Sequence, residues 1–240
     1  MEGNSSMLCD NDEYDQSWER AYNKGEQLNR YPFDIIVSIV MRTFKNVKDR
    51  KAIKVLDLGC GVGNNSLFFA REGFSITGVD ASKSAIHHAN DRFKTENLTG
   101  DFHILDFSEL DKLDTHFDLV IDRQSLSGQS FASAQKTVNM ISSVLKTDGL
   151  FLSMFYNVDH SGYSECLKHA IRQENNTFVF PNKPSKSFSG SRRVTLLDAS
   201  LHAKLFKNFQ ILEMYNHVNV SLKGNSDSDI GEYISLLKKC

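Results

Sequence analysis

The stretch of residues 55–64, with the sequence VLDLGCGVGN, places an acid and alternate glycines directly after an apolar run. Glycines at 59–63 let the backbone turn sharply and approach a ligand closely, because they carry no Cβ atom. A dinucleotide site has the pattern G-x-G-x-x-G, with a pyrophosphate at the helix N-terminus. Here Asn64 replaces the last glycine of that pattern, and Asp57 would repel a pyrophosphate. The stretch therefore favours a nucleoside ligand that has a cationic amino-acid end and no phosphate.

Further acids follow the later apolar runs of the chain. Asp80 ends the run ITGV and could accept hydrogen bonds from both hydroxyls of a ribose. Asp106 is followed by Phe107, and this pair could bind an adenine amino group and stack on its ring. Taken singly, each aspartate could instead cap a helix or close a turn. Together, at the ends of successive strands, they favour S-adenosylmethionine as the ligand.

The elements that must position these residues alternate between strand and helix. Alternation of this kind predicts a mostly parallel sheet with helices on both faces, and ligands bind such sheets at the carboxyl ends of the strands. We expect a doubly wound α/β sandwich of about seven strands, the last one antiparallel. Strands are predicted at 52–58, 75–79, 101–105, 117–121, 150–155, 209–218 and 230–237, and helices at 64–71, 84–95, 132–145 and 196–205.

Two other segments frame this alternating core. Residues 1–45 are predicted to be a frayed end followed by a helical cap that Pro32 divides into two pieces. Residues 46–240 form the ligand-binding domain, with a turn at 223–227 between its last two strands. Residues 157–195 are rich in Ser, Asn and Lys and break the rhythm, so we interpret them as an insertion that binds the second substrate.

The ordered motifs resemble the class I S-adenosylmethionine-dependent methyltransferases. The resemblance covers residues 52–156 and rests on VLDLGCGVG (55–63), VD (79–80), LDF (105–107), FDLVID (117–122) and LKTDGLFL (145–152). It implies a Rossmann-like fold, S-adenosylmethionine as cofactor and methyl transfer as activity. The opening NRYPFD (29–34) is also similar to enzymes of bacterial surface-polysaccharide biosynthesis.

The resemblance also implies roles for individual residues. Asp57 and the glycine turn would hold the methionine part of the cofactor, Asp80 the ribose, and Asp106 and Phe107 the adenine. Asp122 and Gln124 would lie near the sulfonium. The cofactor residues implied in this way are Asp57, Gly59, Cys60, Gly61, Gly63, Asn64, Asp80, Ala81, Asp106, Phe107, Asp122 and Gln124.

In similar enzymes an N-terminal segment folds over the cofactor as a lid, which here would bring Trp18 and Tyr31 to the site. The apolar face of this segment could equally be ordinary packing or a dimer contact.

Methyl transfer from a sulfonium is an in-line displacement, so the protein mainly aligns the reactants and excludes water. A hydroxyl acceptor also needs a general base. His160 is the first candidate for this base because its pKa class suits proton transfer near neutrality. Asp122 and Tyr156 are the other catalytic candidates. The alternative for His160 is an exposed loop histidine.

The sequence after the strand at 117–121 bears on the acceptor. It reads DRQS (122–125), where enzymes that methylate amino groups of nucleic acids carry Asn/Asp-Pro-Pro-aromatic. The Asp-Arg step resembles small-molecule members, including thiopurine-type enzymes. Arg123 and Tyr163 are expected to bind the acceptor. Arg192 and Arg193 are expected to do so as well, because arginine binds phosphate or carboxylate well, which would suit a phosphorylated or nucleotide-linked acceptor. Arg123 could instead pair with Asp122, and Arg192 and Arg193 could be a solvated basic pair.

These observations predict O-methylation of a sugar- or phosphate-containing metabolite. A protein or RNA methyltransferase, a non-catalytic S-adenosylmethionine-binding module and an NAD-dependent reductase are the alternatives.

Composition narrows the class of protein further. The formal net charge of −2 shows no basic excess, which argues against nucleic acid as the main partner. No apolar run approaches a membrane span, so we expect a cytoplasmic protein, either a monomer or a homodimer. The four cysteines are far apart and predict no metal site.

Overall fold

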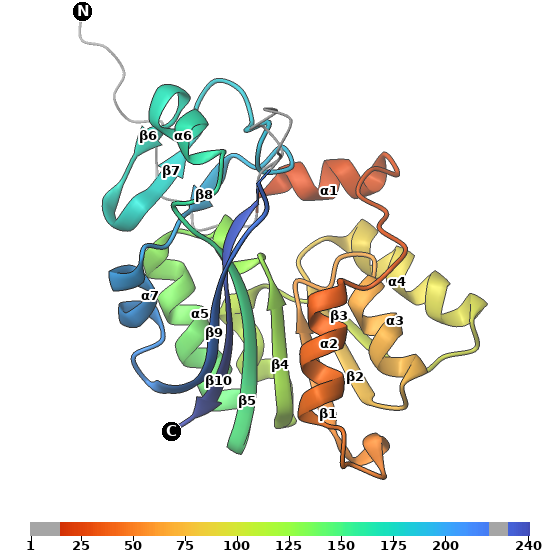
Figure 1. The fold of residues 1–240 in the computed structure, drawn as a ribbon. Helices are drawn as coiled ribbons and strands as arrows, with labels where there is room; N and C mark the ends of the chain where they lie inside the picture. Colours follow the sequence, from red (N-terminus) through yellow and green to blue (C-terminus); the bar gives the residue numbers. More distant parts are fainter. Residues whose placement is uncertain (1–14, 221–229) are drawn as a thin grey trace, which may run out of the picture.

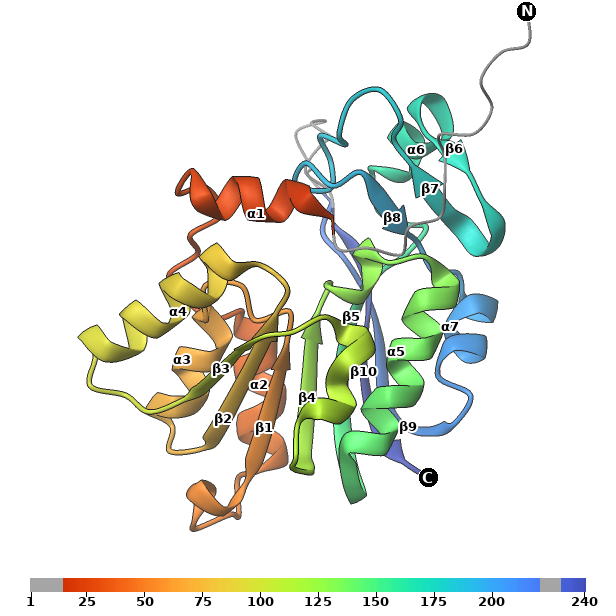
Figure 2. The ribbon, with the colours of Figure 1, turned by 180° about the vertical axis from the view of Figure 1, so that it is seen from behind.

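A computed structural model, which describes residues 15–220 and 230–240, contains a seven-stranded sheet with helices on both faces (Figure 1, Figure 2). The strand order is β3-β2-β1-β4-β5-β10-β9, and β10 runs antiparallel to both of its neighbours. The strands are β1 (Lys54–Leu58), β2 (Ser75–Asp80), β3 (Asp101–Ile104), β4 (Phe117–Arg123), β5 (Leu145–Tyr156), β9 (Phe209–Val218) and β10 (Gly231–Lys239). The predicted doubly wound Rossmann-like sandwich is therefore confirmed.

Apolar side chains bury each helix layer against the sheet. On one face α2 (Asp34–Thr43), α3 (Asn64–Arg71) and α4 (Lys83–Thr95) contribute to one buried cluster. On the other face α5 (Phe131–Val144) and α7 (Ala199–Leu205) contribute to a second. In α2 the buried residues Ile36, Ile39 and Val40 recur at helical spacing, which gives this helix one apolar face. Short 3₁₀ turns lie at Arg50–Ala52, Phe107–Lys112, Leu126–Gly128 and Glu174–Asn176.

The N-terminal segment divides into two parts with different positions. α1 (Gln16–Asn23) crosses above the carboxyl ends of the strands, whereas α2 belongs to the helix layer beside the sheet (Figure 1). Only α1 therefore has the position of the predicted cap. The predicted frayed residues 1–12 and the predicted turn at 223–227 lie outside the described residues.

The segment 157–195 has regular structure of its own. It contains α6 (Tyr163–His169) and a small antiparallel sheet of β6 (Ile171–Arg172), β7 (Thr177–Val179) and β8 (Arg193–Thr195). A separate apolar cluster that includes Cys166, Phe178 and Phe188 stabilises it. Strands of two or three residues are too short for an alternating pattern, so the sequence shows only a break in rhythm here.

Strand order places a crevice between β1 and β4. From β1 the chain moves outward to β2 and β3, and from β4 it moves to the other side through β5. In an open α/β sheet, ligands bind at this reversal, outside the carboxyl ends of the strands. α1 and the insertion lie above the same edge (Figure 2). In the ranges 15–220 and 230–240, no helix is both long and apolar enough to span a bilayer.

Candidate functional site

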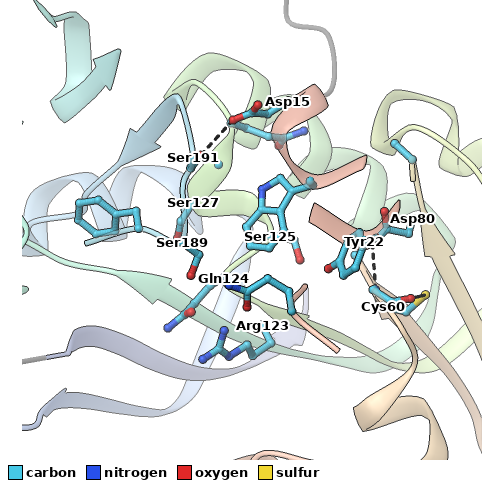
Figure 3. A pocket seen from close by; sticks show the side chains of 18 of the residues that line it. Asp15, Tyr22, Cys60, Asp80, Arg123, Gln124, Ser125, Ser127, Ser189 and Ser191 are labelled. Atoms are coloured by element: carbon cyan, nitrogen blue, oxygen red, sulfur yellow. Dashed lines mark hydrogen bonds between the residues drawn. The ribbon is translucent and has the colours of Figure 1, made fainter. Parts of the chain in front are cut away.

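A cavity lies above the carboxyl ends of β1 and β4, beneath α1 (Figure 3). One side, which we call the turn half, is lined by Gly59, Cys60, Gly61, Val62, Asp80, Ala81, Asp106 and Phe107. The other side, which we call the insertion half, is lined by Ser127, Gly128, Gln129, Tyr156, Phe188, Ser189, Ser191, Arg193 and Val194. Arg123, Gln124 and Ser125 line the cavity at the end of β4, between the two halves.

The glycine turn can form only because two of its residues lack a side chain. Gly59 and Gly61 have φ values of +67° and +52°, in the left-handed region that other residues rarely adopt. A Cβ atom on Gly59 would lie 2.1 Å from the Oγ of Ser125, and one on Gly61 would lie 2.8 Å from the Oη of Tyr22. The turn is therefore held between the end of β4 and α1.

Asp80 fixes the turn from the neighbouring strand and also faces the cavity. Its Oδ2 accepts a hydrogen bond from the backbone N of Gly61 at 2.9 Å, and its Oδ1 accepts one from Ser82 at 2.8 Å. Burial raises the pKa of Asp80 to about 6. A carboxylate can accept about four hydrogen bonds, so Asp80 keeps capacity for the hydroxyls of a ligand.

Asp106 and Phe107 complete the turn half at the end of β3. Oδ1 of Asp106 accepts hydrogen bonds from the backbone N and the Oγ of Ser108, at 2.8 and 2.6 Å. Both residues line the cavity, and the Phe107 ring lies close to Gly59. The structure thus brings a carboxylate and an aromatic face to the same place.

Two predicted site acids are buried and do not line the cavity. Oδ2 of Asp57 accepts a hydrogen bond from the Oγ of Ser66 at 2.6 Å. Oδ1 of Asp122 accepts from the backbone N of Ser125 at 2.9 Å and of Leu126 at 3.2 Å. Burial raises the pKa of each acid to about 7. Neither acid is among the residues that line the cavity, and the cofactor and catalytic roles predicted for Asp57 and Asp122 stay predictions.

His160, the predicted general base, also lies outside the cavity lining. Only 6% of the residue is exposed, and its Nδ1 accepts a hydrogen bond from the backbone N of Gly162 at 3.0 Å. Its ring packs against Phe188 and Tyr156, with centroids 4.6 and 5.0 Å away. The histidine therefore supports two rings that line the cavity, and its predicted role as the base stays a prediction.

The remaining predicted residues divide between the cavity and its surroundings. Tyr163 packs against Phe178 within the insertion, Arg192 is exposed, and Tyr31 is 72% exposed. Gly63 begins α3 below the cavity. The predicted cofactor residues that line the cavity are Trp18, Gly59, Cys60, Gly61, Asn64, Asp80, Ala81, Asp106, Phe107 and Gln124, and the predicted acceptor-side residues that do so are Arg123, Tyr156 and Arg193.

Two acids of the N-terminal segment, which the sequence did not indicate, attach α1 above the cavity. Oδ2 of Asp15 accepts a hydrogen bond from the backbone N of Arg192 at 2.8 Å. The Glu19 carboxylate accepts hydrogen bonds from the Oγ atoms of Ser82 and Ser84, each at 2.6 Å, and these bonds lower its pKa. α1 is thus joined both to the insertion and to the start of α4.

Charged groups elsewhere are not arranged for metal binding. Among the described residues, no group of three His, Cys, Asp or Glu side chains could hold a metal ion.

Comparisons with known proteins point to one family. The family model described as "Methyltransferase domain" matches residues 49–207. A protein of Geobacillus sp. (strain WCH70) that is named as a methyltransferase is 31% identical over 144 residues, which are 58% of this chain and 58% of that protein. An uncharacterized methyltransferase of Schizosaccharomyces pombe (strain 972 / ATCC 24843) is 30% identical over 125 residues, 52% of this chain and 68% of that protein. The matches thus span between about half and two thirds of these proteins.

Solved structures share the fold. A protein of Pyrococcus horikoshii OT3 aligns with a TM-score of 0.64 and 24% identity, over 86% of this chain and 90% of that one. The 1,6-didemethyltoxoflavin-N1-methyltransferase of Burkholderia thailandensis, solved with S-adenosylhomocysteine, aligns with a TM-score of 0.66 and 16% identity, over 93% and 86%. With the family match over residues 49–207, the chain belongs to the class I S-adenosylmethionine-dependent methyltransferases.

Proposed function

We propose that this protein transfers a methyl group from S-adenosylmethionine to a small molecule held in the insertion half of the cavity. The observation that carries the proposal is one continuous cavity that joins the turn half to the insertion half above the end of β4. A methyl donor and an acceptor must be in line and in contact, and a shared cavity permits this.

The turn half offers groups that match each part of the cofactor. Asp80 would accept hydrogen bonds from the ribose hydroxyls, and Asp106 and Phe107 would bind adenine. The methionine part would lie over Gly59 and Gly61, where the absence of side chains leaves room for it. The cofactor supplies the electrophilic methyl group, while these residues fix its position.

The acceptor side is polar and partly closed. Ser127, Gln129 and Ser189 supply hydroxyl and amide groups there, which suits a hydroxyl-bearing acceptor such as a sugar- or phosphate-containing metabolite methylated on oxygen. Burial raises the pKa of Tyr156, so its phenol stays protonated near neutrality and can donate a hydrogen bond to the acceptor. Trp18 of α1 lines the cavity from above and helps to exclude water.

The test uses the full chain and labelled cofactor. Calorimetry should detect S-adenosylhomocysteine binding, and S-adenosylmethionine with a labelled methyl group should then be incubated with a cell extract divided into small-molecule and macromolecular fractions. We expect label in the small-molecule fraction. Label in protein or RNA alone would overturn the proposed acceptor class, and cofactor binding without transfer to any fraction would indicate a non-catalytic module.

A further inference from the structure

Arg123 carries a positive charge on the cavity lining, and its side chain is partly buried. Its guanidinium carbon lies 3.7 Å from the centroid of the Phe33 ring, and its Nε is buried without a hydrogen-bond partner. Within the part of the chain that the structure describes, no carboxylate oxygen lies within 4.0 Å of the guanidinium nitrogens. Burial lowers the pKa of Arg123, although arginine remains charged in proteins.

The nearby acids have other partners. Oδ1 of Asp122 accepts hydrogen bonds from the backbone after β4, while its Oδ2 is buried without a hydrogen-bond partner among the described residues and forms no ion pair with Arg123. Glu232, from β10, is 3% exposed and accepts from the Nε2 of Gln124 at 2.6 Å, and it pairs with the Nδ1 of His217 at 3.0 Å. Tyr156, Glu232 and Asp122 attract the Arg123 cation, but neither acid forms an ion pair with it. The Phe33 ring face attracts the cation less strongly than water did, so the desolvation of Arg123 is only partly offset within the protein.

Arg50 is an arginine of the same molecule that contacts a ring and also has a counter-ion. Its guanidinium carbon also lies over a ring, 5.6 Å from the centroid of Phe74. It differs in that its Nη1 forms an ion pair with the Glu72 carboxylate at 2.6 Å, near the surface. Stacking on a ring therefore does not explain why Arg123 has no counter-ion.

We propose that Arg123 binds the anionic group, a carboxylate or a phosphate, of a ligand in this cavity. The inference rests on the proposed function, because it concerns the same ligands. The guanidinium donates two parallel hydrogen bonds to such groups and is suited to sites that exclude water. Arg123 lies between the turn half and the insertion half (Figure 3), so the anion belongs either to the acceptor or to the methionine end of the cofactor.

A matched pair of ligands shows whether the anion belongs to the cofactor or to the acceptor. S-adenosylhomocysteine carries the amino-acid carboxylate, whereas 5′-methylthioadenosine has the same nucleoside and sulfur without it. Their affinities should be measured by calorimetry for the wild type, Arg123→Met, Arg123→Lys and the control Arg50→Met. Benzoate and phenyl phosphate should then be titrated into each S-adenosylhomocysteine complex, with benzyl alcohol as a neutral control.

If the anion is the cofactor carboxylate, Arg123→Met should bind S-adenosylhomocysteine at least about tenfold more weakly and 5′-methylthioadenosine equally well. If it belongs to the acceptor, S-adenosylhomocysteine binding should be unchanged and the anionic probes should lose their binding to the complex. Arg123→Lys keeps the positive charge but cannot donate two parallel hydrogen bonds, so its affinity should lie between those of the wild type and Arg123→Met. Arg50→Met should match the wild type.

The proposal is overturned if Arg123→Met and Arg123→Lys bind S-adenosylhomocysteine like the wild type and neither anionic probe binds the wild-type complex more tightly than the mutant complexes. Failure of the wild type itself to bind S-adenosylhomocysteine would contradict the proposed function, and the two results are therefore distinguishable. Circular dichroism of each variant checks that a lost affinity is not a loss of folding.

Discussion

The two halves of the cavity are built in different ways. The turn half consists of strand ends and the turns that follow them, and one short hydrogen bond from Gly61 to Asp80 joins two neighbouring strands of the sheet. The insertion half comes partly from the segment 157–195, which has its own small sheet and apolar cluster and which Asp15 joins to α1, and partly from residues 127–129 and Tyr156. One half of the cavity is thus built on the sheet, while much of the other half is built on an added segment.

This difference means that the halves should respond separately to substitution. The largest effect is expected for Asp80→Ala, which removes both the proposed ribose acceptor and the bond that shapes the turn. We expect affinity for S-adenosylhomocysteine to fall by about a hundredfold or more, measured by calorimetry. Phe188→Ala, in the insertion half, should leave that affinity within about twofold. Equal losses in both variants would show that the halves are not independent.

A steric change in the turn should have the next largest effect. Gly59→Ala must place a Cβ 2.1 Å from the Oγ of Ser125 and strain a backbone with φ +67°. We expect a loss of about 2–4 kcal/mol in the free energy of unfolding, read from urea denaturation.

The control for Gly59→Ala is Gly73→Ala. Gly73 also has a positive φ, +85°, but has no atom within 4 Å of the added Cβ, so only the strain of about 1 kcal/mol should appear. The double variant Gly59→Ala with Ser125→Gly should recover part of the stability. If Gly59→Ala costs no more than Gly73→Ala, the close packing of the turn against the end of β4 is not important for stability.

Proton uptake by the three buried acids Asp57, Asp80 and Asp122 should make the stability of the protein depend on pH. Burial raises the pKa of Asp57 and Asp122 to about 7 and of Asp80 to about 6, above the usual value of 3.8. The stability gained by protonation is complete below about pH 4 and is lost as the pH rises through 6 to 7. The ligand-free protein should therefore unfold at a lower temperature at about pH 8 than at about pH 5.5.

The affinity for S-adenosylhomocysteine should rise over the pH range in which the stability falls. Ionised Asp80 accepts hydrogen bonds better, and ionised acids attract the ammonium of the methionine end. Calorimetry in buffers from about pH 5.5 to about pH 8 should show S-adenosylhomocysteine binding more tightly at the higher pH. Asp80→Asn should flatten this dependence, whereas a wild-type affinity independent of pH would contradict the assignment of these acids.

The smallest effect is expected where α1 joins the turn half. Glu19→Gln weakens the partly buried bonds to Ser82 and Ser84, but the amide oxygen of Gln can still accept a hydrogen bond there. We expect S-adenosylhomocysteine to dissociate about two- to fivefold faster, measured by stopped-flow fluorescence of Trp18, with little change in stability. Arg20→Gln on the exposed side of α1 is the control. Unchanged dissociation would show that this contact does not retain the cofactor.

Local patterns were enough to predict the sheet and most of the turn half. α3 begins at Asn64 and β2 ends at Asp80, as the change from apolar run to glycine and acid indicated. Both signals concern residues adjacent in sequence, where backbone propensity decides the structure. The same information could not show that Asp57 accepts from Ser66 and is not among the lining residues, because this depends on how α3 packs.

Contacts between distant segments were not predictable in this way. His160 looks like a loop histidine in the sequence, but β10 passes so close that a Cβ on Gly231 would lie 2.3 Å from the His160 backbone N. The carboxylates of Asp15 and Glu19 have partners more than sixty positions away. A single sequence contains no periodic signal for such pairs, so half of the cavity could be outlined only as an insertion.

The position of β10 has a consequence for synthesis on the ribosome. β10 follows β9 in the sequence, yet it lies between β5 and β9 and is the only strand to which β9 is hydrogen-bonded among the described residues. The edge of β5 therefore stays unpaired, and β9 cannot join the sheet, until β10 has emerged. Glu232 arrives with β10 and binds Gln124 beside Arg123. The nascent chain can form β1 to β5 early, but the cavity end of β4 gains this contact only after β10 has been translated.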